Sequence, residues 1–385
     1  MDLSKARARP HRVRVVTVIG TRPQLIKVGA LQPVLRQRVD EVFVDTGQHW
    51  DDNMAGSFFS ELGLARPDYS LGAGGGSHAE QTAAMLVAIE PILVRERPDA
   101  VVVVGDTNST LAAALAAAKL DLPVAHVEAG LRAYDRRIPE ELNRVVVDHL
   151  ARLLFAPTPT AVQNLRAEGI VDGVSLTGDL MQDLAADVLP SIRDATVLQG
   201  IGARLGMQLA PGGYIFVTIH RASNREPAAL AAWTNLLGQL ARPGRQVIVA
   251  LHPGTRAALD REGIRFGPGI TVIEPQGYRT SLAMQLHAAA VVTDSGGVTR
   301  EAAWLTVPCL VLRPSTEWHE AVATSGGRLV AVALDAQRAA FELDRLAPVP
   351  EAEAKARARS ASLDLRRAGA AEAITEQLAS LAAAA

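Results

Sequence analysis

The sequence predicts an α/β protein with two Rossmann-like, doubly wound domains. Short β-branched runs alternate with longer stretches rich in Ala and Leu, which is the pattern of βαβ units around a parallel sheet. The chain has 385 residues, enough for two domains of ordinary size. A strand-poor stretch, residues 181–209, separates two sets of predicted strands. We therefore expect one domain over residues 1–180 and a second over residues 181–365.

The predicted strands follow one another along each domain. In the first domain they cover residues 13–19, 41–45, 100–105, 123–127, 153–156 and 174–176. In the second they cover residues 214–218, 246–251, 270–273, 291–293, 309–312 and 328–330. From Glu351 onward the chain is rich in Ala, Glu, Lys and Arg and predicts one or two surface helices. Ligands of doubly wound sheets bind outside the carboxyl ends of the strands, so the two domains are expected to face each other across a ligand cleft.

The composition is that of a globular protein, with 48% hydrophobic and 21% charged residues. A net charge of −2 provides no global field to attract nucleic acid or an anionic membrane. The single cysteine, Cys309, excludes an intramolecular disulfide and is expected to pack as a small hydrophobic residue. No apolar segment reaches the ~20 residues that span a bilayer, and the basic N-terminus lacks the apolar core of a signal peptide. We expect a cytoplasmic protein without nucleic-acid or membrane partners.

Acidic residues follow two strands of the first domain that have the composition of buried strands. Asp106 comes directly after the strand at residues 100–105, and Glu128 directly after the strand at residues 123–127. Glu140 and Glu141 follow further along the chain. Strand carboxyl ends point into the ligand crevice, and carboxylates there are costly to desolvate, so they are usually retained for chemistry. This edge is therefore predicted to be catalytic.

Two cations lie just beyond the first strand. Arg22 follows Gly20, a residue that lets the backbone approach a ligand. Lys27 comes one helical turn after Pro23 and can face the mouth of the crevice. Two cations at this position suit a diphosphate. Taken alone, the segment is equally well explained by a capped helix with solvated charges.

A turn of small residues opens a helix in the second domain. The segment at residues 293–297, Thr-Asp-Ser-Gly-Gly, ends a strand, and Glu301 lies one turn inside the helix. Small residues at a helix N-terminus expose backbone N–H groups to an anion, and Glu301 can accept hydrogen bonds from ribose hydroxyls. Many strand–helix turns have this composition. Its place in the second domain, opposite Arg22 and Lys27, favours a seat for nucleotide phosphates.

Two histidines, His220 and His252, follow successive strands of the second domain and are expected at one edge. A histidine at a strand end is often only a hydrogen-bonded structural residue. We find neither HExxH nor paired Cys/His spacing, so no metal site is predicted. A GxGxxG segment that opens a helix after a strong strand is missing, as is GxxxxGK[ST]. We therefore expect no hydride transfer, no phosphorylation and no cofactor.

An ordered set of motifs runs along the chain: GTRPQLIK, TGQH, GDTNST, HVEAGLR, PEELNR, TIHR, HP, DSGG and REA. Together, from about Val15 to Arg328, they resemble the non-hydrolysing UDP-N-acetylglucosamine 2-epimerases. The resemblance implies the glycosyltransferase-B architecture, in which the C-terminal helix, here residues 366–385, crosses back to the first domain. It also implies a homodimer in the cytoplasm that makes UDP-N-acetylmannosamine for polysaccharide or natural-product pathways.

The reaction that the resemblance implies explains why acidic residues follow the strands of the first domain. The C2 proton of the sugar is not next to a carbonyl group, so simple enolisation is not possible. The family is understood to eliminate UDP, which leaves a 2-acetamidoglucal, and to add UDP back with the opposite configuration at C2. Such a reaction needs a base on one face of C2, an acid on the other and a clamp on UDP.

The resemblance assigns roles to the residues that match the family's motifs. The catalytic residues are Asp106, Glu128 and Glu140, with His220 near the leaving diphosphate. The residues that bind UDP and the sugar are Arg22, Lys27, Gln48, His49, Arg132, Arg144, His252, Gln276, Tyr278, Ser295, Gly296, Gly297, Glu301, Arg313, Thr316 and Glu317. Which acid takes the proton in each direction stays open.

Three segments depart from the best-known bacterial pattern. Residues 50–53, Trp-Asp-Asp-Asn, replace an Arg-containing segment tied to allosteric activation. Ser281 replaces an aromatic residue near the uracil site, where Tyr278 can substitute. Trp318 stands in a loop that usually reads TERPE and can reshape the sugar pocket, so a variant UDP-sugar stays open as the substrate.

Three alternative functions remain open from the sequence. A hydrolysing 2-epimerase would release UDP and free N-acetylmannosamine. A glycosyltransferase of the same fold would also use a UDP-sugar, but it would need an acceptor groove and usually lacks three crowded acids. A degenerate UDP-sugar sensor would bind without turnover, which the intact acids argue against.

Overall fold

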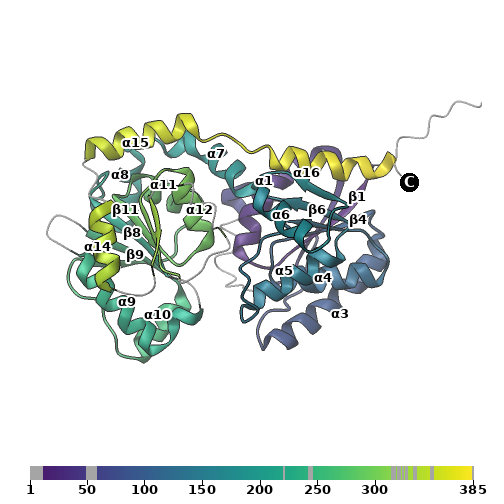
Figure 1. Cartoon of the computed structure of the whole chain (residues 1–385), viewed down its shortest axis with the longest axis horizontal. Helices are drawn as coiled ribbons and strands as arrows, with labels where there is room; N and C mark the ends of the chain where they lie inside the picture. Colours follow the sequence, from purple (N-terminus) through teal and green to yellow (C-terminus); the bar gives the residue numbers. More distant parts are fainter. Residues whose placement is uncertain are drawn as a thin grey trace, which may run out of the picture. The chain divides into compact units, whose positions relative to one another are not determined.

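The structure is a computed structural model that describes residues 12–48, 59–219, 222–241, 246–313, 318, 322, 325, 328–332, 336–346 and 351–383. The chain forms two compact units, one made of Met1–Leu184 with Ala368–Ala385 and the other of Ala185–Arg367. Each unit contains one parallel sheet covered by helices (Figure 1). The predicted fold class, α/β with two doubly wound parallel sheets, is confirmed.

The sheet of the first unit has the strand order β3-β2-β1-β4-β5-β6-β7, and every pair in it is parallel. The strands are β1 (Arg14–Ile19), β2 (Asp40–Asp45), β3 (Tyr69–Ser70), β4 (Ala100–Val104), β5 (Val124–Val127), β6 (Leu153–Ala156) and β7 (Val174–Leu176). The sequence did not reveal β3, because two residues are too few to show an alternating pattern. The chain winds outward in both directions from β1 and β4, so the topological switch point lies between these two strands.

Helices cover both faces of this sheet. They are α1 (Arg22–Arg38), α3 (His78–Glu96), α4 (Asn108–Lys119), α5 (Pro139–Leu150), α6 (Pro159–Ala167) and α16 (Ala370–Ala379), and α7 (Leu180–Ile192) runs across the division between the units. On one face α4 lies between α3 and α5, and its buried alanines, among them Ala113 and Ala116, let the helices approach closely (Figure 1). Helix α16 packs against α1 and is held by Asp183, whose carboxylate accepts hydrogen bonds from Gly369 N and Ala371 N at 3.0 Å each.

The second unit repeats the arrangement with the strand order β10-β9-β8-β11-β12-β13. Its strands are β8 (Tyr214–Ile219), β9 (Gln246–Leu251), β10 (Ile270–Ile273), β11 (Ala290–Thr293), β12 (Cys309–Val311) and β13 (Leu329–Ala331). All described strand pairs are parallel, and the switch point lies between β8 and β11. Cys309 is fully buried in β12, as its apolar surroundings predict.

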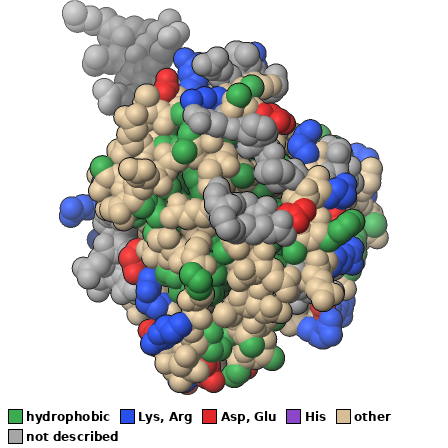
Figure 2. All heavy atoms as spheres, turned by 90° about the vertical axis from the view of Figure 1, so that its left-hand side faces the viewer, with side chains coloured by type: hydrophobic (Ala, Val, Ile, Leu, Met, Phe, Trp, Pro, Cys, Tyr) green, Lys and Arg blue, Asp and Glu red, His purple; other side chains and the backbone are tan. Residues whose placement is uncertain are grey.

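The helical elements of the second unit are α8 (Val197–Leu205), η1 (Ala222–Arg225), α9 (Pro227–Leu240), α10 (Pro253–Arg261), α11 (Tyr278–His287), α12 (Gly296–Trp304), α14 (Ala336–Leu346) and α15 (Glu351–Asp364). Trp233 of α9 and Leu343 of α14 are buried in one core with the apolar side chains of β8 and β9. The face of the molecule in Figure 2 carries Lys and Arg side chains interspersed with hydrophobic ones. No helix among the described residues is long and apolar enough to cross a membrane.

Candidate active site

The first switch point brings together the carboxyl ends of β1 and β4. Gln24 of α1 joins the two strand ends, since its Oε1 accepts from Gly20 N at 2.9 Å and its Nε2 donates to the Val104 carbonyl at 2.7 Å. The turn after β4 therefore lies beside the N-terminus of α1. Asp106 stands on this turn with a side chain that is 30% exposed, enough to reach a ligand.

Asp106 is paired with Arg144 of α5. One guanidinium nitrogen of Arg144 donates to Asp106 Oδ2, and another donates to Glu141 Oε2 at 2.6 Å. The backbone carbonyl of Asp106 accepts from Asn143 Nδ2 at 2.9 Å. The Asp106 carboxylate is thus fixed from α5 while one part of it stays accessible.

A second ion pair lies beside the first. Lys27 Nζ of α1 donates to Glu128 Oε2 at the end of β5, and each side chain is only 9% exposed. A Cβ at Gly105 would lie 3.2 Å from this ammonium and 3.5 Å from the same carboxylate oxygen. Gly105 has a φ of 68°, so it lacks a side chain for conformational reasons and also leaves room for the ion pair.

Glu128 has a strained backbone. Its φ of 72° lies in the left-handed region, which costs a residue with a side chain about 1–2 kcal/mol. The N–H groups of Glu128 and Ala129 both point to the Phe155 carbonyl, each at 3.1 Å, which holds the turn in place. Strain of this kind at the end of a strand is typical of functional sites, where it aims a side chain.

The two adjacent glutamates of α5 have different surroundings. Glu141 is buried, and its carboxylate accepts from the backbone N–H groups of Ala133 and Tyr134 as well as from Arg144. Glu140, the residue assigned by the family motif, is exposed on the first turn of the helix. Glu141 is therefore a brace for the loop after β5, and Glu140 is the one available to a ligand.

Three other predicted residues of the first unit differ in accessibility. Arg22 is half-buried as the first residue of α1. Gln48 is buried, and its Oε1 accepts from Ser109 N at 3.0 Å and from Ser109 Oγ at 2.7 Å. Arg132 is also buried, with Nε, Nη1 and Nη2 all bonded within the protein. Of these three residues, only Arg22 is partly exposed.

The second switch point carries hydroxyl groups and a helix N-terminus. Thr218 and Thr293, at the ends of β8 and β11, share a hydrogen bond of 2.6 Å between their hydroxyls. Ser295 is the N-cap of α12, and its Oγ accepts from Val298 N at 3.4 Å. Gly296 and Gly297 form the first turn of α12 and are half-buried. This N-terminus has the small residues and backbone N–H groups that bind a phosphate.

Glu301 lies one turn inside α12. It is buried and accepts a hydrogen bond of 2.6 Å from Gln285 of α11. Arg300 stacks on the ring of Trp318, with its guanidinium carbon 3.8 Å from the ring centroid. Trp318, which departs from the family pattern, therefore packs against a cation of α12.

Four more predicted residues of the second unit are among those that the structure describes. His252 is the N-cap of α10, where its Nδ1 accepts from Gly254 N at 3.0 Å. Gln276 precedes α11 and donates to the Glu274 carbonyl at 2.7 Å. Tyr278 and Arg313 are both buried. His49, His220, Thr316, Glu317 and residues 50–53 lie outside the described residues. Among the residues that the structure describes, no group of three or more His, Cys, Asp or Glu side chains could hold a metal ion.

The family model of UDP-N-acetylglucosamine 2-epimerase matches residues 34–379. The chain belongs to this family. It is 41% identical over 316 residues to a UDP-N-acetylglucosamine 2-epimerase homolog of Methanococcus maripaludis, which covers 80% of this chain and 86% of the relative. It is also 40% identical over 329 residues to the UDP-2,3-diacetamido-2,3-dideoxy-D-glucuronate 2-epimerase of Pseudomonas aeruginosa, which covers 84% and 90%.

A solved structure of the family shares the fold. The UDP-GlcNAc 2-epimerase of Methanocaldococcus jannaschii, in complex with UDP-GlcNAc and UDP, superposes with a TM-score of 0.84. The two chains are 33% identical, and the match covers 95% of this chain and 99% of that one. The glycosyltransferase-B type of fold that the motifs imply is therefore confirmed.

Within this 2-epimerase family site, sequence reasoning missed several buried polar residues. They are Gln24, Asn143, His126 and Asp148. Glu141 belongs to the acidic pair that the sequence indicated, but its bonds to the loop after β5 were not predicted. Helical spacing carried a signal for part of the set, because Glu141, Arg144 and Asp148 are separated by three and four residues and so share one face of α5. His126 had a signal too, since it interrupts the otherwise apolar strand β5.

Proposed function

We propose that this protein epimerises UDP-N-acetylglucosamine at C2 to UDP-N-acetylmannosamine without net hydrolysis. Membership of the 2-epimerase family supports the reaction class. The observation that carries the proposal is the cluster at the first switch point. There the Asp106 and Glu128 carboxylates follow adjacent strands and are each paired with a cation.

The proposed reaction has two steps. A carboxylate takes the C2 proton, the electron pair forms the C1–C2 double bond, and the C1–O bond breaks so that UDP leaves with its electrons. The resulting 2-acetamidoglucal then accepts a proton at C2 from the opposite face, and a UDP oxygen bonds again to C1. Asp106, Glu128 and Glu140 are the groups that we propose for these proton transfers.

The paired cations suit the same chemistry. Lys27 and Arg144 compensate the charges of the Glu128 and Asp106 carboxylates in a partly dehydrated place, which suits carboxylates that accept a proton. Arg22, at the N-terminus of α1, can meet the negative charge of the departing diphosphate. We propose that His220, which the family motif assigns to the leaving diphosphate, acts at the same stage.

We propose that the second unit binds the nucleotide. The N-terminus of α12, with Ser295, Gly296 and Gly297, is suited to a phosphate, and Glu301 to the ribose. The other motif residues assigned to UDP or the sugar, among them His252, Gln276, Tyr278 and Arg313, stay part of this proposal. The internal hydrogen bonds of Gln48 and Arg132 favour a supporting role for these two residues instead.

Incubation with UDP-N-acetylglucosamine in D2O tests the reaction. We expect UDP-N-acetylmannosamine with deuterium at C2 and no free UDP beyond a trace. Free UDP that accumulates one-for-one with sugar loss would show a hydrolysing enzyme. Sugar transfer to an added acceptor without exchange at C2 would show a glycosyltransferase, and UDP-sugar binding without exchange would show a sensor.

A different UDP-sugar is the second candidate substrate. The chain is 40% identical to a UDP-2,3-diacetamido-2,3-dideoxy-D-glucuronate 2-epimerase, which makes this UDP-sugar a candidate substrate. The same exchange experiment with both sugars, compared by kcat/KM, decides between them. A higher kcat/KM for the glucuronate would reassign the substrate while keeping the reaction.

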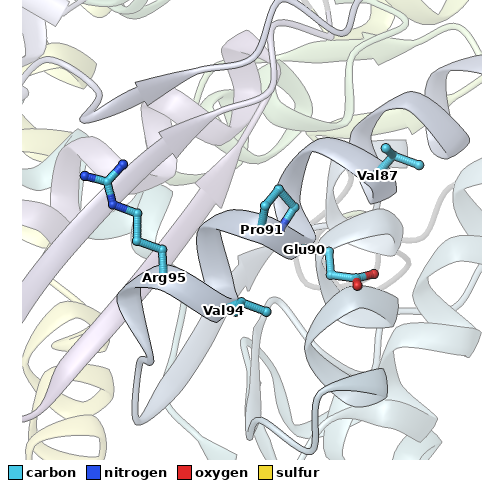
Figure 3. Close-up of a pocket in the computed structure, with 5 residues that line it drawn as sticks. All are labelled: Val87, Glu90, Pro91, Val94 and Arg95. Carbon is cyan, nitrogen blue, oxygen red and sulfur yellow. The ribbon is translucent and has the colours of Figure 1, made fainter.

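We further propose that the protein is a homodimer that uses the outer face of α3. Val87 and Val94 are 74% and 56% exposed. Together with Pro91 they follow one another at helical spacing and line a shallow apolar hollow on α3. Figure 3 shows these side chains on α3 together with Glu90 and Arg95, which line the same hollow. Two antiparallel copies of this helix can place Glu90 of each copy near Arg95 of the other, as an isologous contact requires.

Sedimentation of Val87→Glu/Val94→Glu tests this interface. We expect the wild-type protein to sediment as a dimer and the double variant as a monomer, because buried glutamates repel each other and lose solvation. The exposed Val171, which lies on the loop before β7, provides the control substitution Val171→Glu. A double variant that stays dimeric would contradict the use of this face.

A further inference from the structure

His126 of β5 is fully buried between two hydrogen-bond acceptors. Its Nδ1 lies 2.6 Å from Asp148 Oδ1, and its Nε2 lies 2.7 Å from the carbonyl oxygen of Gly105. Both distances are those of strong hydrogen bonds. A carboxylate and a carbonyl oxygen only accept, so the ring must donate at both positions.

A neutral imidazole has only one N–H group. In either neutral tautomer, one ring nitrogen would present a lone pair to an oxygen lone pair at under 3 Å, with no water in between. The imidazolium form, which carries two N–H groups, makes both bonds. The contacts of His126 therefore require a buried cation, whereas an ordinary histidine is mostly neutral at pH 7.

The surroundings compensate this charge. Asp148 Oδ2 accepts from Arg132 Nη1 at 2.7 Å and from Gly130 N at 3.0 Å. Arg132 in turn makes a bidentate pair with Glu168 through two bonds of 2.7 Å. Two cations and two carboxylates thus form one chain with no net charge, which is the condition under which buried ions are tolerated.

This chain ends at the proposed active site. The Gly105 carbonyl belongs to the peptide group that joins Gly105 to Asp106, and Gly105 N donates to the Val127 carbonyl at 2.9 Å. Glu128 directly follows Val127. His126 therefore holds the peptide group between Gly105 and Asp106. This peptide group lies beside Val127, the residue that precedes Glu128.

We propose that His126 is a positioning residue, an imidazolium held by Asp148, which fixes the Gly105–Asp106 peptide and so the direction of the Asp106 carboxylate. The positioning role rests on the proposed function of Asp106. The protonation state does not, because it follows from the hydrogen bonds alone.

The ¹⁵N spectrum of the ring in the unmodified protein tests the protonation state. With histidine labelled and the His126 resonances assigned through the backbone, we expect both ring nitrogens to have the shift of a protonated nitrogen in neutral buffer. The exposed His149, on the same helix as Asp148, is the internal reference. An unprotonated, pyridine-type nitrogen at His126 would overturn the proposal, and no variant has to fold for this result.

The kinetics of His126→Gln test the positioning role. Glutamine keeps one donor but cannot make both bonds, so we expect kcat to fall by about 10²-fold, the effect of misplacing a catalytic group by ~1 Å. KM and the Kd for UDP should change less than about twofold, and His149→Gln should leave all three unchanged. An unchanged kcat in folded His126→Gln would overturn the positioning role. If the wild-type protein exchanged C2 of neither UDP-sugar, the proposed function would fail instead, while the nitrogen spectrum would still decide the state of His126.

Discussion

The carboxyl edges of the two sheets share a topology but present different chemistry. At the first switch point, the groups beside the strand ends are ion pairs, Lys27 with Glu128 and Arg144 with Asp106. At the second, the described strand ends meet through the hydroxyls of Thr218 and Thr293 and lead into the Ser295 cap of α12.

The difference agrees with the roles that we propose for the two edges. A carboxylate that accepts a proton must be ionised beforehand, and in a partly buried place a nearby cation favours that form. A phosphate arrives with its own negative charge and binds to N–H and hydroxyl donors. In the function that we propose, the same fold therefore supplies acid–base chemistry in one unit and anion binding in the other.

Asp106→Asn is expected to have the largest effect. The amide keeps the shape of the carboxylate but cannot take a proton, so kcat should fall by about 10²–10⁴-fold while UDP still binds. Epimerisation followed by NMR and UDP titration by calorimetry measure the two quantities. Asp99→Asn, just before the opposite end of β4, is the matched control, because Asp99 accepts only a structural bond from Arg14 N among those the structure describes. Near-normal turnover of Asp106→Asn would show that Asp106 does not transfer a proton in the reaction.

Asp148→Asn is expected to destabilise the first unit by about 3–5 kcal/mol, since it leaves a buried cation without its partner. Burial disfavours the charged form of Asp148, but His126 and Arg132 together outweigh it and lower the pKa of this carboxyl. A lowered folded-state pKa stabilises the protein above the ordinary aspartate pKa of about 4, and this contribution is lost as the pH falls through the folded-state pKa. Urea unfolding should therefore show the full difference from wild type at pH 7 and a smaller one below pH ~4. A difference that does not depend on pH would contradict the ionised state of Asp148.

Gly105→Ala separates backbone strain from contact with the ion pair. The φ of 68° should cost about 1–2 kcal/mol in unfolding free energy, and the new Cβ would lie 3.2 Å from Lys27 Nζ. Gly263 of the second unit has a φ of 65° and open space around its Cβ position, so Gly263→Ala carries the same strain alone. We expect similar losses of stability in chemical denaturation, with a lowered kcat only for Gly105→Ala. Equal kcat values in the two variants would show that the ion pair tolerates displacement.

Ser295→Ala is expected to have the smallest effect. Loss of the cap bond to Val298 N should cost about 1 kcal/mol in stability and weaken UDP binding severalfold. The rate of C2 exchange at saturating UDP-sugar should not change, because we propose no proton transfer at Ser295. Ser77→Ala removes the N-cap of α3 in the first unit and should leave UDP binding intact. A lowered exchange rate at saturation in Ser295→Ala would weaken the contrast between the edges.

Much of the fold could be predicted because it depends on local patterns. The β-branched runs and the Ala/Leu-rich stretches fixed nearly all of the strands to within a residue or two, and the motifs indicated the family. The two-residue β3 was missed because it has too little sequence to show a pattern. The sequence indicated Asp106, Glu128 and Ser295 because each lies within two residues of the end of a strand, and their roles stay predictions.

The sequence by itself determined which residues stand at the strand ends, since strand order along the chain and side-chain chemistry are local properties. Only the tertiary structure decided which of these residues are buried and which partners they bind. Glu140 and Glu141 are adjacent in sequence, yet one is exposed and the other is buried on Arg144. His126, Asp148 and Arg132 form one network because β5, α5 and the loop between them are folded against each other. Charge and protonation depend on burial and on partners distant in sequence. For that physical reason the acids after β4 and β5 could be found from the sequence, but their orientation could not.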